Sequence, residues 1–206
     1  ERLEIPEYVT RIESYAFTFC IGIGGILTIP DTVQYIGDGA FSHCTGITEL
    51  IIGNNITDIM PNTFSFCTNL TSLTIPETII SIDSQAFSSC TGIKGSLVIP
   101  DSVLYIGTGA FFYCTGLDGE LVISKNLGVI NSFTFQYCAS ISGLLEIPES
   151  VRSIEEYAFS SCSGFNGSLI IPDTVLHVGK FAFSFCEGFN GTLKIKSNTK
   201  IEIGNN

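Results

Sequence analysis

Basic residues, histidine and tryptophan are scarce in this chain of 206 residues. It holds 9 Lys and Arg against 20 Asp and Glu, 2 His and no Trp, so the formal net charge is −11. Proteins bind phosphate backbones through clusters of Lys and Arg, and such clusters are missing here, so the sequence predicts no nucleic-acid partner. No apolar run is long enough to span a bilayer, and we expect no direct membrane insertion within this segment.

Motifs typical of catalysis and of cofactor or metal binding are also missing. The chain contains no G-x-G-x-x-G after a strand, no G-x-S-x-G, no H-E-x-x-H and no C-x-x-C. With 2 histidines in all, a histidine-centred mechanism has almost no candidate residues. A dispersed pair of carboxylates stays open, although no pair stands out. We therefore predict that the chain is not an enzyme, with no catalytic residues, no cofactor and no metal site.

What the chain does contain is a repeat. Its 8 cysteines recur at intervals of 23 or 24 residues, each three residues after a Phe, and most units read L-x-I-P-[DE]-[ST]-V-x-x-I-G-x-x-A-F-x-x-C. A unit this short cannot bury its own apolar face, so neighbouring copies must stack and share one core. We predict one repeat domain over residues 1–206, with a degenerate capping half-repeat at 193–206 and eight units that start near Leu3, Leu27, Leu50, Leu73, Leu97, Leu121, Leu145 and Leu169. Because the first residues already lie within the repeat, we expect a longer parent protein.

The apolar spacing within a unit indicates its local structure. Leu73 and Ile75 alternate with period two, which is typical of a short strand, and Pro76 ends it because proline has no N–H for a ladder. The later spacing of Ala86, Phe87 and Cys90 favours a helical turn or a loop that returns the chain to the next strand.

These motifs resemble the BspA-like class of the leucine-rich repeat superfamily, which includes surface proteins of oral bacteria and parasitic protists. The resemblance rests on Ile-Pro-Asp/Glu-Ser/Thr-Val, Ala-Phe-x-x-Cys and Leu-x-x-Leu-x-Ile, and it covers all eight units. It implies an α/β leucine-rich-repeat solenoid: a curved, right-handed stack with short parallel strands on the concave face and loop or short-helical returns on the convex face. The chain departs from the general pattern where a buried Asn would follow the strand. Seven of eight residues there have short polar side chains, which we expect to bond the turn backbone.

Each recurring residue has a structural and a functional interpretation. The cysteines are either a column of buried free thiols, which we favour because Cys packs as a small hydrophobe, or a set of stacked disulfides. The Phe column indicates core packing. The column of turn acids is either a calcium ladder or, as we favour, a set of acceptors for local backbone hydrogen bonds.

Strand alternation identifies a candidate binding surface. The residue between the inward Leu and Ile of each unit points outward, and it varies where the frame does not. Four of these residues are β-branched and apolar, which favours a binding role over neutral drift. The predicted partner-binding residues are Glu4, Thr28, Ile51, Thr74, Val98, Val122, Glu146 and Ile170. Flanking positions are Ile26, Glu49, Ser72, Ser96, Glu120, Leu144, Ser168 and Thr192.

Two functional hypotheses follow. The resemblance implies a non-enzymatic adhesion module at the cell surface or in the extracellular space, which recognises a host, matrix or neighbouring-cell surface protein through the concave sheet. The alternative is an intracellular, cytoplasmic scaffold of cytoskeletal or signalling type, which eight free thiols would suit. Four N-x-S/T sequons, at Asn55, Asn69, Asn166 and Asn190, favour the first hypothesis mildly.

Overall fold

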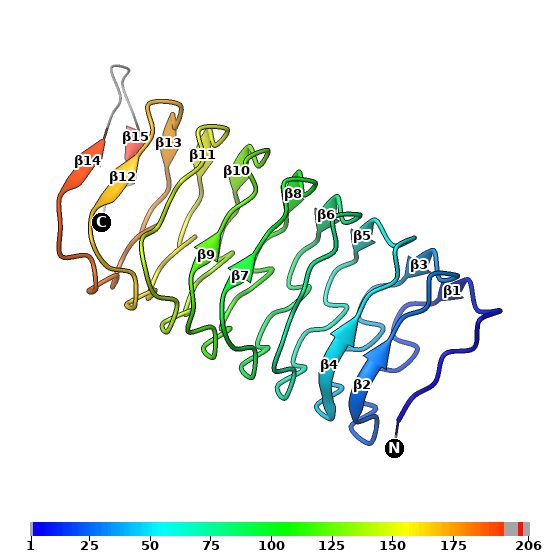
Figure 1. Cartoon of the computed structure of the whole chain (residues 1–206). Coiled ribbons are helices and arrows are strands. Elements are labelled where there is room, and N and C mark those ends of the chain that lie inside the picture. The colour runs from blue at the N-terminus through cyan, green and yellow to red at the C-terminus, as the bar shows by residue number, and fades with distance from the viewer. Residues whose placement is uncertain (1, 196–201, 204–206) are drawn as a thin grey trace.

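The computed structural model is an elongated stack of coils that runs from the N-terminus to the C-terminus (Figure 1). It describes residues 2–195 and 202–203. Strands of neighbouring coils pair in parallel at an offset of about 24 residues, so that Leu97 lies against Leu121 and Leu169 against Leu193. The chain is therefore a solenoid of parallel strands, as the repeat predicts.

A first column of strands follows the Leu-x-Ile motifs, and its outer surface is called the strand face below (Figure 1). Leu and Ile point into the core, so the residue between them points outward. These strands are β2 (Gly25–Thr28), β4 (Ile47–Ile51), β7 (Leu97–Val98), β9 (Leu121–Val122), β12 (Leu169–Ile171) and β14 (Leu193–Ile195).

A second column, called the back ladder below, follows the V-x-x-I motifs, where we predicted no strand. Its inward residue is in most coils an Ile, such as Ile82 or Ile106, and is buried. These strands are β1 (Arg11–Ile12), β3 (Tyr35–Ile36), β5 (Asp58–Ile59), β6 (Ser81–Ile82), β8 (Tyr105–Ile106), β10 (Val129–Ile130), β11 (Ser153–Ile154), β13 (His177–Val178) and β15 (Glu202–Ile203). The predicted capping half-repeat at 193–206 lies mostly outside the described residues, which there include only β14 and β15.

The prediction of short-helical returns is wrong, because the described residues form no helix. It follows that no helix in this part of the chain could cross a membrane. In the return segment, alternate N–H groups donate to the next coil, as Gln85 does to the carbonyl of Thr108 (3.0 Å) and Phe87 to that of Ala110 (2.8 Å). A helix needs every N–H for its own turn. Gln85 and Ser89 are also left-handed, with φ of 56° and 60°, and residues of this conformation interrupt a helix.

The left-handed position before each Ala-Phe pair gives a testable prediction. Gly39 and Gly109 occupy it in other coils, also with positive φ. Because a Cβ is strained in this region, we expect Gln85→Gly to be about 1 kcal/mol more stable than Gln85→Ala. Urea unfolding followed by circular dichroism measures the difference. The order should reverse at exposed Leu104, which has no positive φ; the same order at both sites would contradict the assignment.

The core is built from stacked columns of identical residues, as predicted. The Phe rings stack face to face from coil to coil, for example Phe64 on Phe87 at 5.5 Å and Phe87 on Phe111 at 5.6 Å between centroids. Interplanar angles along this column, from Phe17 to Phe183, stay between 5° and 14°. This continuous core fixes the spacing of the coils and thus the positions of the outward side chains.

Candidate functional site

The structure places all eight predicted binding residues at the surface, seven of them exposed and Thr28 half-buried. The most exposed apolar members are Val98 (54%), Ile51 (46%), Val122 (45%) and Ile170 (41%). Strand pairing brings six of the eight together in neighbouring pairs: Thr28 with Ile51, Val98 with Val122, and Glu146 with Ile170. Glu4 and Thr74 lie outside the assigned strands.

Pairing on the strand face is interrupted, which the sequence did not predict. Its strands pair as β2 with β4, β7 with β9 and β12 with β14. No strand pairing or isolated bridge joins β9 to residues 145–147, the corresponding segment of the next coil. Both segments belong to described coils, so this is a break in the ladder, and a second break separates residues 73–75 from β7.

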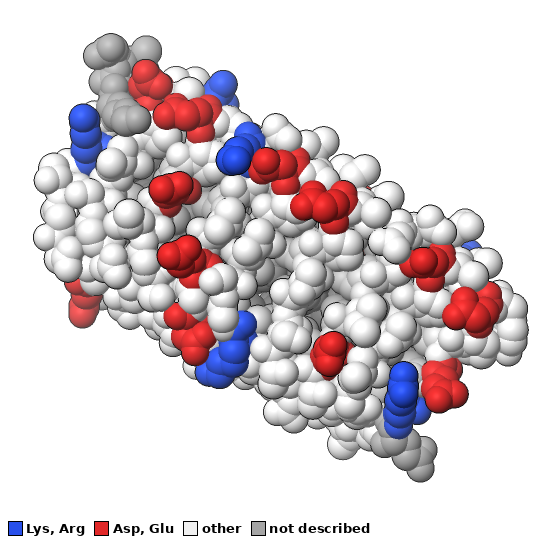
Figure 2. Space-filling view, viewed as in Figure 1, with Lys and Arg blue, Asp and Glu red and all other residues white. Residues whose placement is uncertain are grey.

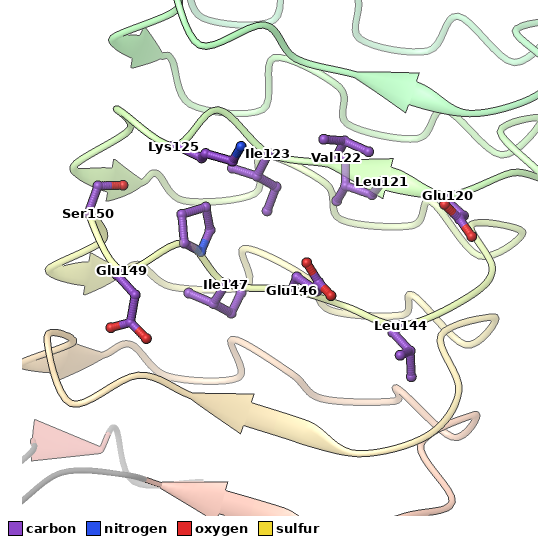
Figure 3. A pocket seen from close by; sticks show the side chains of 11 residues that line it. Glu120, Leu121, Val122, Ile123, Lys125, Leu144, Glu146, Ile147, Glu149 and Ser150 are labelled. Carbon is purple, nitrogen blue, oxygen red and sulfur yellow. The ribbon is translucent and has the colours of Figure 1, made fainter.

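A groove lies at the break after β9. It has a volume of about 610 Å³ and runs between β9 and the segment 144–149 (Figure 3). A second groove, of about 520 Å³, adjoins it on the other side of Glu146 and reaches Ile170 and Pro172. The groove at β9 is bordered by apolar Val122 and Leu144 and by three glutamates, Glu120, Glu146 and Glu149. The predicted binding row therefore crosses the hollowed part of the strand face.

Charge on the visible surface is sparse and mainly acidic, as Figure 2 shows for the same view as Figure 1. Beside the groove, the Lys125 ammonium lies 4.0 Å from a carboxylate oxygen of Asp101. The described residues contain no group of three or more side chains that could hold a metal ion.

Where the column of turn acids is interrupted, the acid of the preceding coil accepts a hydrogen bond from the backbone of the next turn. A carboxylate oxygen of Asp31 accepts a hydrogen bond from the backbone N–H of Asn54 (2.7 Å), and one of Asp101 accepts from that of Lys125 (2.8 Å). Asn54 and Lys125 are the two residues that replace an acid in the column. An acid of one coil thus holds the turn of the next, which supports the interpretation as backbone acceptors.

All eight cysteines are free thiols, as predicted. From Cys44 onward, each thiol donates to the carbonyl of the Phe in the preceding coil, for example Cys90 to Phe64 at 3.1 Å and Cys114 to Phe87 at 3.1 Å. Burial raises the pKa of the Cys90 thiol from 9.0 to about 12. A thiol that stays protonated is a poor nucleophile, so burial makes Cys90 a packing residue and not a reactive one.

The buried thiols predict a loss of stability at high pH. Above pH 9.0 the unfolded chain loses the Cys90 proton while the folded chain keeps it up to about pH 12, so the stabilisation is complete below this window and is lost within it. The loss is about 1.4 kcal/mol per pH unit for one such thiol. In urea unfolding, Cys90→Ala should therefore show a shallower fall in unfolding free energy than the wild type between about pH 9.5 and 11. Parallel slopes would contradict this account.

Aromatic columns on the return turns are a surface feature that sequence reasoning missed. Phe19, His43 and Phe66 stack at 4.2 and 4.4 Å. Phe133, Tyr157 and Phe181 stack at 5.4 and 5.0 Å. All six residues are left-handed. They occupy the variable positions two residues before or after the invariant Phe, and the recurrence of aromatics at 133, 157 and 181 was the available signal.

Comparisons with known proteins agree with this architecture. The family model described as "BspA type Leucine rich repeat region (6 copies)" matches residues 1–118 and 128–206. A leucine-rich repeat protein from Bacteroides ovatus is 28% identical with a TM-score of 0.72, over 91% of this chain and 55% of that one. The T. pallidum leucine-rich repeat protein supports the fold alone, with 24% identity and a TM-score of 0.66 over 75% of this chain and 70% of that one. Among curated proteins, none matches. The chain thus spans about half the length of the B. ovatus protein.

Proposed function

Because this chain belongs to the BspA-type leucine-rich repeat family, we propose that it is a non-enzymatic module that binds a protein partner through the strand face. One observation carries the proposal: a row of outward apolar side chains stands on a frame whose inward Leu, Ile, Phe and Cys columns are buried through most of the inner coils. Ile51, Val98 and Val122 are all more than 40% exposed on this face. Solvent-facing aliphatic groups in a row offer area for a protein interface, and repeat proteins use such extended surfaces for binding.

The proposal also includes the extent of the domain and the curvature of the stack. The chain would form a single domain of eight units closed by a capping half-repeat, and the stack would curve in a right-handed sense with the strand face on its concave side. The regular register of about 24 residues in both columns supports one continuous stack, as in Val98 against Val122 and Ile130 against Ile154. A concave face increases the number of side chains that contact one partner.

The proposed compartment is the cell surface or extracellular space, with a host, matrix or neighbouring-cell protein as the partner. The sequons support it unequally. All four sequon asparagines are exposed, but the side-chain amide of Asn55 donates to the carbonyl of Asp31 (2.6 Å) and that of Asn190 accepts from the backbone N–H of Gly167 (3.0 Å). The alternative, a cytoplasmic scaffold, is supported by the free thiols, because reduced cysteines are the rule in that compartment.

Competition binding tests the proposed function. The labelled purified chain is applied to a surface coated with extracellular matrix proteins, and its retention is measured against increasing unlabelled chain. We expect saturable retention that excess unlabelled chain displaces. Retention that rises linearly and is not displaced would contradict a specific binding face.

A further inference from the structure

The groove at β9 carries information about the partner's chemistry. Its border includes the exposed side chains of Val122 and Leu144 (45% and 57% exposed), so part of its surface is apolar and in contact with water. Its volume of about 610 Å³ is within the range of about 300 to 1,000 Å³ that is common for ligand pockets. An elongated groove with an apolar border fits the aliphatic side chains of an extended segment better than a compact polar molecule.

Three carboxylates are distributed along the groove. Glu149 lies at one end, Glu120 at the other and Glu146 between them (Figure 3). The basic residue that lines the groove, Lys125, lies at the Glu149 end and beside Asp101. Three carboxylates against one ammonium make the groove acidic on balance, in a chain whose net charge is −11. An acidic groove repels phosphates and other anions and attracts Arg and Lys side chains.

We propose that this groove binds a short extended segment of the partner protein in which Arg or Lys residues lie next to Val, Ile or Leu. The aliphatic side chains contact Val122 and Leu144, and the cations pair with Glu120, Glu146 and Glu149. Arginine suits these positions best because its planar guanidinium forms paired hydrogen bonds with a carboxylate. The inference rests on the proposed function, since it assigns the partner's chemistry at the same face.

Three exposed glutamates outside the predicted binding row and its flanking positions provide the control. Glu77 follows a Pro as Glu149 does, and Glu156 and Glu187 lie in the return segments. The groove variant is Glu120→Gln, Glu146→Gln and Glu149→Gln, and the control variant is Glu77→Gln, Glu156→Gln and Glu187→Gln. Both variants remove three negative charges, but only the first changes this groove.

The probe is a fluorescein-labelled hexapeptide, Arg-Ile-Arg-Val-Arg-Ile with an amidated C-terminus, titrated with the whole chain and followed by fluorescence anisotropy. We expect the wild type to bind it, the groove variant to raise the Kd about tenfold, and the control variant to change the Kd less than about twofold. A peptide with Ser in place of Ile and Val should bind more weakly, because the aliphatic contacts are lost. Circular dichroism checks that both variants fold.

Two results would overturn the inference. Equal losses in the groove and control variants would show attraction to the overall negative charge, and no binding to the wild type would show that the groove does not accept this chemistry. Displaceable retention on matrix together with either result would leave the proposed function standing. If the wild type binds the peptide but its retention on matrix proteins is not displaced by unlabelled chain, the proposed binding of matrix proteins would be contradicted and the groove's preference for this peptide would stand.

Discussion

Substituting Asp for Ile51, Val98 and Ile170 together is expected to abolish retention of the chain on its partner and to leave the fold intact. The three side chains are 46%, 54% and 41% exposed, so replacing them removes little buried area. In a complex, however, each new carboxylate would lose water without gaining a partner, and burying an uncompensated charge costs several kcal/mol. Retention is measured by the same competition assay, and folding by circular dichroism and thermal unfolding.

The back ladder offers the control for this triple variant. Ile80, Leu104 and Leu176 precede β6, β8 and β13 and are 46%, 57% and 52% exposed, so changing them to Asp adds the same charge at similar exposure. This control variant should keep full retention. Equal retention by both variants would contradict a role for the strand face. Unfolding of the Ile51, Val98 and Ile170 variant would show that these side chains support the fold.

Replacing Phe87 by Ala is expected to lower the free energy of unfolding by about 3 to 5 kcal/mol. The ring is fully buried and stacks between Phe64 and Phe111, so its loss leaves a cavity between two rigid neighbours. Because coils contact mainly their neighbours, the loss should be concentrated in the coils on either side. Urea unfolding measures the total.

The exposed Leu104 provides the comparison for Phe87. It is 57% exposed, so Leu104→Ala should change the unfolding free energy by no more than about 0.5 kcal/mol. Similar costs for the two substitutions would contradict the stacked Phe column as the principal core of the solenoid.

The period, the core columns and the outward row could be predicted because each depends on apolar side chains that recur in every coil. The return segment could not. The spacing of Ala86, Phe87 and Cys90 fits a helical turn and a non-helical return segment equally. Which of the two forms depends on backbone N–H groups that donate to the next coil. Apolar spacing contains no information about those partners. The back ladder was missed for the same reason.

The polar column after each strand shows a second limit. We expected these side chains to bond the turn backbone, and Asn55 and Asn126 do reach a carbonyl of the preceding coil, at 2.6 and 2.7 Å. The hydroxyls of Thr32, Thr78, Ser102 and Thr174 are buried without a partner, so the prediction is wrong for them. The hydroxyl of Ser150 does reach a carbonyl of the preceding coil, that of Leu127 at 2.8 Å. Side-chain length therefore does not by itself decide which residues of this column find a partner.

The candidate site was predictable in its row of residues but not in its shape. Alternation within Leu-x-Ile places Val122 and Glu146 outward whatever the neighbouring coils do. The grooves depend instead on how neighbouring coils pack. The groove at β9 lies where pairing with residues 145–147 is missing, in a coil that departs from the repeat at Ser124, Lys125 and Leu127. The binding role of the row stays a prediction that the substitutions above test.

The central claim is that this chain works as a binding module at the cell surface, and antibody labelling of source cells tests it most directly. Intact, unpermeabilised cells and permeabilised cells are labelled in parallel with an antibody raised against the purified chain. The account predicts labelling of the intact cells. Labelling that appears only after permeabilisation would contradict it and would favour the intracellular scaffold.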